Sequence, residues 1–111
     1  MTTTPKRLVN GSQLTTSAAT YYTSTGVKTR IDALVLVNTA GSAATATVHL
    51  VPSGDSASAS NCILSAKSIN AGDFYVVPGA LSQWLEAGGT LQALASANTT
   101  ISIVASGVQF T

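Results

Sequence analysis

Charged side chains are scarce in this sequence of 111 residues. Lys and Arg number five and Asp and Glu four, so charged residues make up 8% of the chain, where about 25% is usual. Proteins that bind DNA or RNA need clustered cations to displace counterions from phosphates, and five dispersed cations argue against a nucleic-acid partner. Disordered chains combine high charge with few apolar residues, whereas 45% of this chain is hydrophobic, which favours one folded domain.

Cysteine and long hydrophobic runs are lacking as well. The single cysteine, Cys62, cannot form an internal disulfide and has no second thiol at metal-ligand spacing, which suits a reducing cytoplasm. Residues 33–54 and 87–111 carry no Lys, Arg, Asp or Glu, but Asn, Gly, Ser and Thr interrupt both stretches, so we predict no transmembrane segment and no membrane partner. Residues 1–13 lack the apolar run of a secretory signal, and we expect assembly in the cytoplasm.

The residue types that build active sites are also few. His49 is the only histidine and falls in the middle of a predicted strand with no Gly-x-Ser-x-Gly motif elsewhere, so we interpret it as a solvated or pocket-lining side chain. Hydrolysis by a pair of carboxylates needs two acids that lie close together. Of the four acids, Asp55 and Asp73 each follow a glycine in a turn, where Asp commonly bonds its own backbone, and only Asp32 and Glu86 are left. No glycine spacing matches a phosphate-binding loop. We therefore predict no enzyme, no cofactor, no metal site and no small-molecule substrate.

Small and hydroxyl-bearing residues dominate instead, with 17 Ala, 16 Thr and 14 Ser. Short apolar or alternating runs bounded by turn residues recur along the chain, and this pattern is typical of β-strands. The predicted strands are 31–37, 44–51, 62–69, 74–77, 90–95 and 100–110, with weaker candidates at 6–9 and 20–22. Residues 31–37 are apolar on both faces, which predicts a central strand.

The turn chemistry predicts how these strands connect. Asn38 to Ser42 reads NTAGS and favours a β-hairpin between 31–37 and 44–51, and Ser96 to Thr99 favours another between 90–95 and 100–110. Asn10-Gly11 favours a tight turn between the two weak strands. Pro52–Asn61, which is small and polar throughout, is the longest predicted loop.

Residues 78–89 leave two interpretations open. Leu81, Trp84 and Leu85 have the spacing of a short helix near 80–86, but the same stretch can equally be a strand. In either case the sequence predicts an all-β protein: residues 6–111 form a single β-sandwich or jelly-roll-like domain of about seven to eight antiparallel strands. Residues 1–5, MTTTP, are expected to form an N-terminal tail that frays or docks on a neighbour.

Charge is unevenly distributed between the two parts of the chain. Residues 1–31 carry four cations and no acid, for +4, whereas residues 32–111 carry one cation and four acids, for −3. The predicted strands also hold almost no Lys, although soluble β proteins commonly use Lys to protect exposed sheet edges. We therefore expect an edge or face to be covered by another copy or another protein. The candidate interface residues are Lys6, Arg7, Lys28, Arg30 and Trp84.

Two blocks of the chain resemble a group of small virion proteins of tailed bacteriophages. They are Val27–Ser58, VKTRIDALVLVNTAGSAATATVHLVPSGDSAS, and Leu85–Thr111, LEAGGTLQALASANTTISIVASGVQFT. In that group a Tyr-containing strand precedes a Leu-Val-Pro-Ser-Gly loop, a Leu-x-Ala-Gly-(Asp/Gly)-Thr segment and a closing Ser-Gly-Val strand. The positions that match this pattern are Tyr21-Tyr22, Leu50–Gly54, Leu85–Thr90 and Ser106–Val108. Gly89 departs from it, because Asp is common there.

The resemblance implies a structural protein located in the virion. The first expectation is a capsid decoration (cement) protein that binds the assembled head and stabilises it, with the major capsid protein or another virion protein as partner. A tail, collar or baseplate accessory protein is an alternative, and so is a receptor- or glycan-recognition module of a tail fibre. Homotrimers are common among decoration proteins, so a homotrimer is expected. Residues 1–9 and the four cations Lys6, Arg7, Lys28 and Arg30 are expected to contact the shell.

Overall fold

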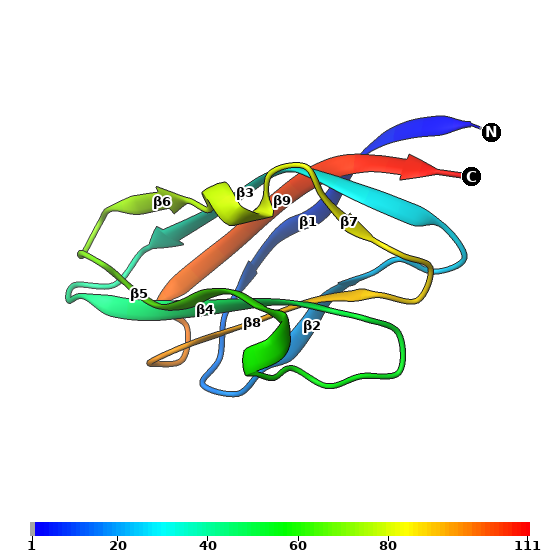
Figure 1. Cartoon of the computed structure of the whole chain (residues 1–111). Coiled ribbons are helices and arrows are strands. Elements are labelled where there is room, and N and C mark those ends of the chain that lie inside the picture. Colours follow the sequence, from blue (N-terminus) through cyan, green and yellow to red (C-terminus); the bar gives the residue numbers. More distant parts are fainter. Residues whose placement is uncertain (1) are drawn as a thin grey trace.

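Antiparallel β-strands form two stacked sheets in the computed structural model, which describes residues 2–111 (Figure 1). Sheet A contains β1 (Thr3–Gln13), β9 (Ile101–Phe110), β3 (Lys28–Asn38), β6 (Phe74–Val76) and β7 (Gln83–Leu85). Sheet B contains β2 (Ala19–Thr23), β8 (Thr90–Ala95), β4 (Ala44–Val51) and β5 (Cys62–Ile69). Two 3₁₀ turns, η1 (Ala59–Asn61) and η2 (Pro78–Ala80), complete the secondary structure of the described residues. The predicted all-β sandwich is confirmed.

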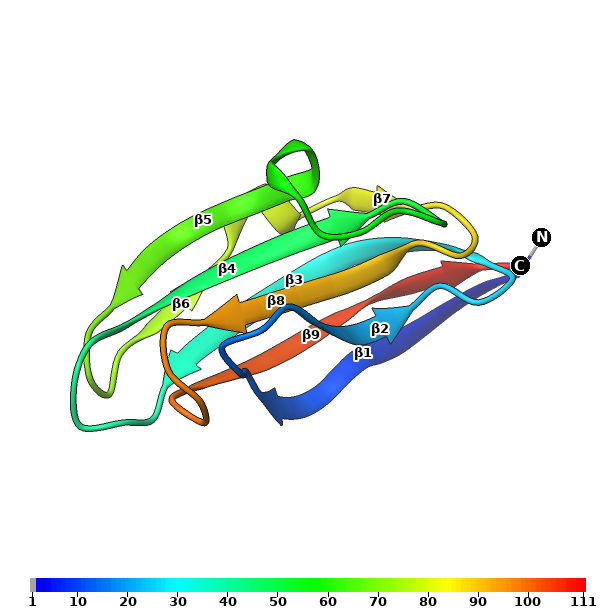
Figure 2. The same cartoon turned by 90° about the horizontal axis from the view of Figure 1, so that it is seen from below.

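The strand order is that of a jelly roll. Sheet A runs β1-β9-β3-β6, and β7 pairs with the same edge of β3 as β6, further along it. Sheet B runs β2-β8-β4-β5. Because β6 and β7 share one strand position, the nine strands of residues 2–111 fill eight positions, as a jelly roll requires. Figure 2, seen from below, shows the strands of sheet B side by side in this order.

Both predicted hairpins are wrong, because each pair of strands is divided between the sheets. β3 belongs to sheet A and β4 to sheet B, and the turn between them crosses the sandwich. The Asn38 side chain holds this crossing, since its amide donates to the carbonyl oxygens of Ser42 (2.9 Å) and Ile69 (2.8 Å). β8 and β9 are divided in the same way. Alternation indicates which side chains face the core but not which strand is the neighbour.

The N-terminal segment differs from the prediction in two respects. Residues 1–5 are expected to form a tail, but β1 begins at Thr3 and pairs with β9 from Thr3 opposite Phe110 onward. Met1 lies outside the described residues. Asn10-Gly11 makes no tight turn: β1 continues through it with a register shift between Val9 and Ser12, and Gly11 has a φ of 120°. The dipeptide therefore forms a β-bulge.

The ambiguous stretch 78–89 contains no α-helix. Pro78–Ala80 form the 3₁₀ turn η2, and Gln83–Leu85 then pair with β3 as β7. The strand interpretation is therefore correct for Gln83–Leu85 only, and the helix interpretation of 80–86 is wrong. Trp84 lies opposite Arg30 in this pairing, whereas Leu85 is buried opposite Thr29. Alternation along β7 thus points Trp84 outward and Leu85 into the core, whereas a helix would place both on one face.

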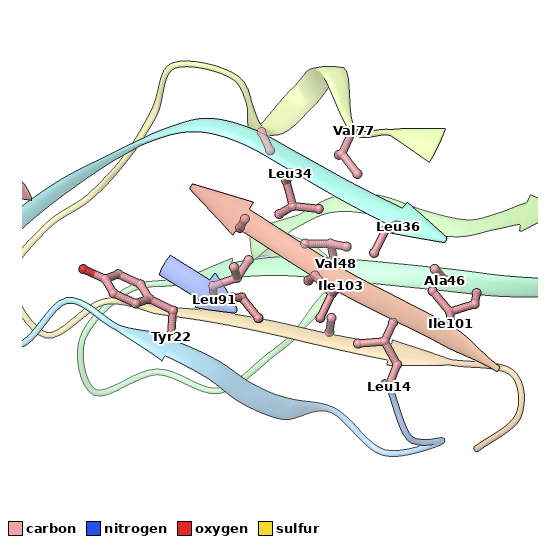
Figure 3. Close-up of a cluster of buried hydrophobic side chains, with 14 of the residues drawn as sticks. Leu14, Tyr22, Leu34, Leu36, Ala46, Val48, Val77, Leu91, Ile101 and Ile103 are labelled. Carbon is pink, nitrogen blue, oxygen red and sulfur yellow. The ribbon is translucent and has the colours of Figure 1, made fainter. Parts of the chain in front are cut away.

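The core lies between the sheets and is filled by aliphatic side chains from both (Figure 3). Leu34 and Leu36 of β3 and Ile103 of β9 project from sheet A, and Val48 of β4 and Leu91 of β8 project from sheet B. All five are fully buried. Fully burying one such side chain contributes about 1.5–3 kcal/mol, so this layer is the main source of stability.

A chain of hydroxyl groups joins the two sheets at the end opposite Asn38. Gln109 Nε2 donates to Tyr22 Oη at 2.7 Å, and Tyr22 Oη lies 2.7 Å from Thr29 Oγ1. Thr29 Oγ1 lies 2.8 Å from Ser24 Oγ, which donates to the Val27 carbonyl oxygen at 2.5 Å. Because both ends are fixed, each hydroxyl accepts one hydrogen bond and donates the next. Ser24 and Thr29 are fully buried, so the network is satisfied entirely within the protein.

Candidate interaction surface

The outer face of sheet A, the face that points away from the core, is defined by the strand register. Along β3 and β9 the fully buried residues alternate with partly exposed ones, which therefore point outward. A bulge between Ile31 and Ala33 shifts the alternation of β3 by one residue. The outward positions are Lys28, Arg30, Ala33, Val35 and Val37 on β3, and Ser102, Val104, Ser106, Val108 and Phe110 on β9.

Apolar side chains meet across the strands on this face. Val35 lies opposite Val104 of β9 on one side and opposite Val76 of β6 on the other. Val37 lies opposite Phe74 in the next row. Directly opposed side chains in an antiparallel sheet are about 5 Å apart, so these five side chains form a continuous patch. We call Val35, Val37, Phe74, Val76 and Val104 the apolar band.

The most exposed large hydrophobic side chains of the described residues all come from the segment that forms this edge of sheet A. Phe74 is 62% exposed, Val76 43%, Leu81 43% and Trp84 49%. Phe74 and Val76 belong to β6 and Trp84 to β7, and Figure 1 shows both strands following one edge of β3. Single exposed hydrophobic residues are common, but a cluster on one edge and face is a candidate interaction site.

The outer face of sheet B has the opposite character. Its outward positions carry hydroxyl and amide groups, which hydrogen-bond water readily. They include Thr20, Thr23, Thr45, Thr47, Thr90 and Gln92, while Leu94 and His49 occupy outward positions in the same rows. An antiparallel sheet with one face in the core and the other in water shows this alternation of apolar and polar residues. Sheet B therefore has the composition of a solvated face, whereas sheet A does not.

A hollow of about 410 Å³ lies at the end of sheet A near the termini, lined by Lys28, Trp84, Glu86 and Phe110. The rings of Trp84 and Phe110 are 5.0 Å apart between centroids and inclined by 40°, and the Arg30 guanidinium lies 5.8 Å from the centre of the Phe110 ring. Lys28 Nζ lies 3.5 Å from Glu86 Oε2, in an exposed ion pair. The lining of the hollow thus combines two aromatic rings with one cation and one anion.

Four of the five predicted interface residues lie on the outer face of sheet A. Arg7 is opposite Ser106, Lys28 opposite Phe110, and Arg30 is flanked by Val108 and Trp84. Lys6 alternates to the other side of β1, which is an edge strand. Arg30 also forms an ion pair with Asp32, at 2.9 Å, so two of the three cations on this face, Lys28 and Arg30, are paired within the chain.

The apolar band and Phe110 are functional candidates that the sequence analysis did not single out. The segment 31–37 is apolar on both faces, a pattern that predicts a central strand. That interpretation is correct, since β3 has neighbours on both sides. However, a central strand of a two-layer sandwich has one face outside the core, so the same pattern also indicates an apolar outer surface.

His49 lies on the other sheet and is 7% exposed, which makes it a buried side chain and not a solvated one. Its Nδ1 is 3.0 Å from Asn61 Oδ1. Asn61 Oδ1 also accepts from the Ser58 amide, so it is the carbonyl oxygen and the His49 Nδ1 carries the proton. His49 lines a second hollow together with Cys62, which is partly buried. Within residues 2–111, no three His, Cys, Asp or Glu side chains gather as metal ligands would.

Comparison with known proteins gives no relative from which a function can be transferred: no family model, curated protein or solved structure matches this chain. In the described part of the chain, no helix has the length and hydrophobicity needed to cross a membrane. The fold and the surface define the class of protein: a jelly-roll domain with one outer face rich in hydroxyl groups and one outer face that carries the apolar band.

Proposed function

We propose that this chain is a structural protein of a tailed-bacteriophage virion, namely a capsid decoration (cement) protein that binds the assembled head. The observation that supports this proposal most strongly is the open edge of β1, because the exposed cations Lys6 and Arg7 lie there beside an unpaired strand edge that another protein can cover. The resemblance of Val27–Ser58 and Leu85–Thr111 to small phage virion proteins supports the viral setting. Jelly rolls occur in viral coat proteins, an analogy that agrees with this role.

The proposed mechanism is thermodynamic. A protein that binds the assembled shell but not the separated subunits stabilises the shell by mass action. The contact with the shell is assigned to the β1 edge, where Lys6 and Arg7 are exposed and form no ion pair among the described residues. β1 also presents an unpaired backbone edge, which can hydrogen-bond to a strand of another protein.

Co-sedimentation with heads of the encoding virus that lack this protein tests the proposal. The protein is expected to saturate the heads at a fixed ratio and to leave dissociated capsid subunits unbound. The double variant Lys6→Ser, Arg7→Ser should bind at least tenfold more weakly at low salt. Lys67→Ser is the matched control, since Lys67 lies on β5 of sheet B, 4.8 Å from the Tyr75 ring. No saturable binding to heads, or equal binding of both variants, contradicts the proposal.

Two alternatives within the virion predict different results. A tail, collar or baseplate accessory protein would bind isolated tails and leave heads bare, so the same co-sedimentation separates the two locations. A receptor- or glycan-recognition module is favoured by one observation, the hollow with Trp84 and Phe110 beside Lys28 and Glu86, because saccharides stack on exposed aromatic rings. Binding to a glycan array that Trp84→Ala abolishes without unfolding the protein would support this second function.

A further inference from the structure

We propose that two copies of this chain pair through the outer faces of their A sheets, with the apolar band at the centre of the contact. This inference goes beyond the proposed function, because it concerns the protein free in solution and holds whether or not the chain decorates a capsid. The second copy would cover the apolar band, which holds the most exposed large hydrophobic side chain of the described residues, Phe74.

The apolar band lacks the features that keep an exposed sheet face soluble. Its two most exposed members are Phe74 and Val76, and Val35, Val37 and Val104 are partly exposed beside them. No Lys, Arg, Asp or Glu lies within the rows that the band occupies. The equivalent positions of sheet B carry mostly Thr and Gln, with Leu94 and His49 among them. Covering the band therefore removes apolar surface from water without burying a charge.

The charges around the band favour a second copy over a strongly charged partner. Arg30 is paired with Asp32 and Lys28 with Glu86, so the ion pairs at this end of sheet A are already neutral. A partner that relied on acidic or basic groups would find no complementary charge at the band. The same face of a second copy offers apolar groups against apolar groups, which is the complementarity that the band requires.

Arg7, the remaining cation of the outer face, is compatible with this arrangement. It lies on β1, two strands away from β3 in sheet A. A two-fold axis that passes near Val35 and runs parallel to β3 places the two Arg7 side chains on opposite margins of the contact, roughly 20 Å apart for strands spaced at about 4.8 Å. At that distance the two charges are screened by salt and both stay in water.

The area available is sufficient for a stable pair. Sheet A presents four strand positions, and its two long central strands, β3 and β9, have eleven and ten residues. With about 4.8 Å between strands and about 3.3 Å per residue, this face covers roughly 600 Å² in projection. Stable interfaces bury about 800 Å² of accessible surface on each partner, and accessible surface exceeds its flat projection. The contact therefore takes up most of the face, with the apolar band at its centre and the internally paired Lys28 and Arg30 at one end.

The symmetry of the contact fixes the stoichiometry. When each copy uses the same face against the same face of the other, the contact is isologous and closes at two. The pair should therefore have twice the mass of the 11.2 kDa chain. This differs from the homotrimer that the resemblance to phage proteins implies, so the native mass distinguishes the two.

Sedimentation equilibrium from about 1 μM to about 500 μM tests the pairing. The unmodified protein should form a dimer. Val76→Lys places a charge in the band at an outward position of an edge strand, and it should weaken dimerisation at least tenfold. Phe74→Ser, which removes apolar area without adding charge, should weaken it to a smaller extent. Thr20→Lys is the matched control, an outward position on the edge strand β2 of sheet B, and it should leave the dissociation constant unchanged.

Each variant is first shown to be folded: its far-ultraviolet circular dichroism spectrum should match that of the unmodified protein, and its melting temperature should agree within a few degrees. A protein that stays monomeric over the whole range overturns the pairing, and so does a trimer. A dimer that Val76→Lys and Phe74→Ser leave intact also overturns it. Binding to capsids is measured separately, so a monomer that still saturates heads would refute the pairing and leave the proposed function standing.

Discussion

Replacing Thr29 by Val tests whether the buried hydroxyl network joins the two sheets. Val has nearly the shape of Thr, so the substitution leaves no cavity but removes the hydroxyl that lies 2.7 Å from Tyr22 Oη and 2.8 Å from Ser24 Oγ. Tyr22 then loses its acceptor and Ser24 its donor, in a fully enclosed site. At about 1–1.5 kcal/mol for each lost hydrogen bond, Thr29→Val should lower the free energy of unfolding by about 2–3 kcal/mol.

Thermal unfolding followed by circular dichroism provides the assay. For a chain of this length, 1 kcal/mol corresponds to about 4 °C, so Thr29→Val should melt about 10 °C below the unmodified protein. Thr29→Ser is the control, because it keeps the hydroxyl and loses only a methyl group, at a cost of about 1 kcal/mol. If Thr29→Val proves as stable as Thr29→Ser or more stable, the network contributes nothing and the reasoning is refuted. Adding Tyr22→Phe to Thr29→Val should cost less than the sum of the two single effects.

Two further predictions concern the strand pairing and the titration of the fold. Gly107→Ala should destabilise the protein by about 1–3 kcal/mol, because a Cβ at this position collides with the carbonyl oxygen of Arg30 on the neighbouring strand. Urea unfolding measures this loss of stability. An unchanged urea midpoint would contradict the strand pairing at the β3 bulge. Burial raises the pKa of the Tyr21 phenol above its usual value of about 10. The neutral phenol is therefore favoured in the folded state, and its stabilising contribution is present below pH 10 and lost as the pH rises through the folded-state pKa. A spectrophotometric titration at 295 nm, with Tyr21→Phe as the difference reference, should show this residue ionising later than free tyrosine; ionisation at or below pH 10 contradicts its burial.

The sequence predicts the fold class and most strand positions because alternation between core and surface is a local property. The strands at 44–51, 62–69 and 90–95 agree with β4, β5 and β8, and the central place of 31–37 is correct. The strand neighbours are not local. The turn after Asn38 has the composition of a hairpin, yet it crosses between sheets, because its geometry depends on a hydrogen bond from Asn38 to Ile69, thirty-one residues away.

The candidate surface is predictable only in part, for the same reason. Lys28, Arg30 and Trp84 are recognisable in the sequence as unusual residues, and the fold brings them to one end of one face. The apolar band depends on which strands lie beside β3. Val104 and Val76 are nearly thirty residues apart in the chain, and only the register of β9 and β6 against Val35 places them in one row. No local pattern contains that information.

The central claim is that the outer face of sheet A is covered when the protein is assembled. Hydroxyl-radical footprinting followed by mass spectrometry tests it most directly, because Phe74 at 62% exposure is both a reactive side chain and the most exposed large hydrophobic residue of the apolar band. Phe74 should react several times more slowly in the assembled protein than in protein diluted below the dissociation constant. Tyr21 on β2 of sheet B should react at the same rate in both states. Equal reactivity of Phe74 in the two states would contradict the account.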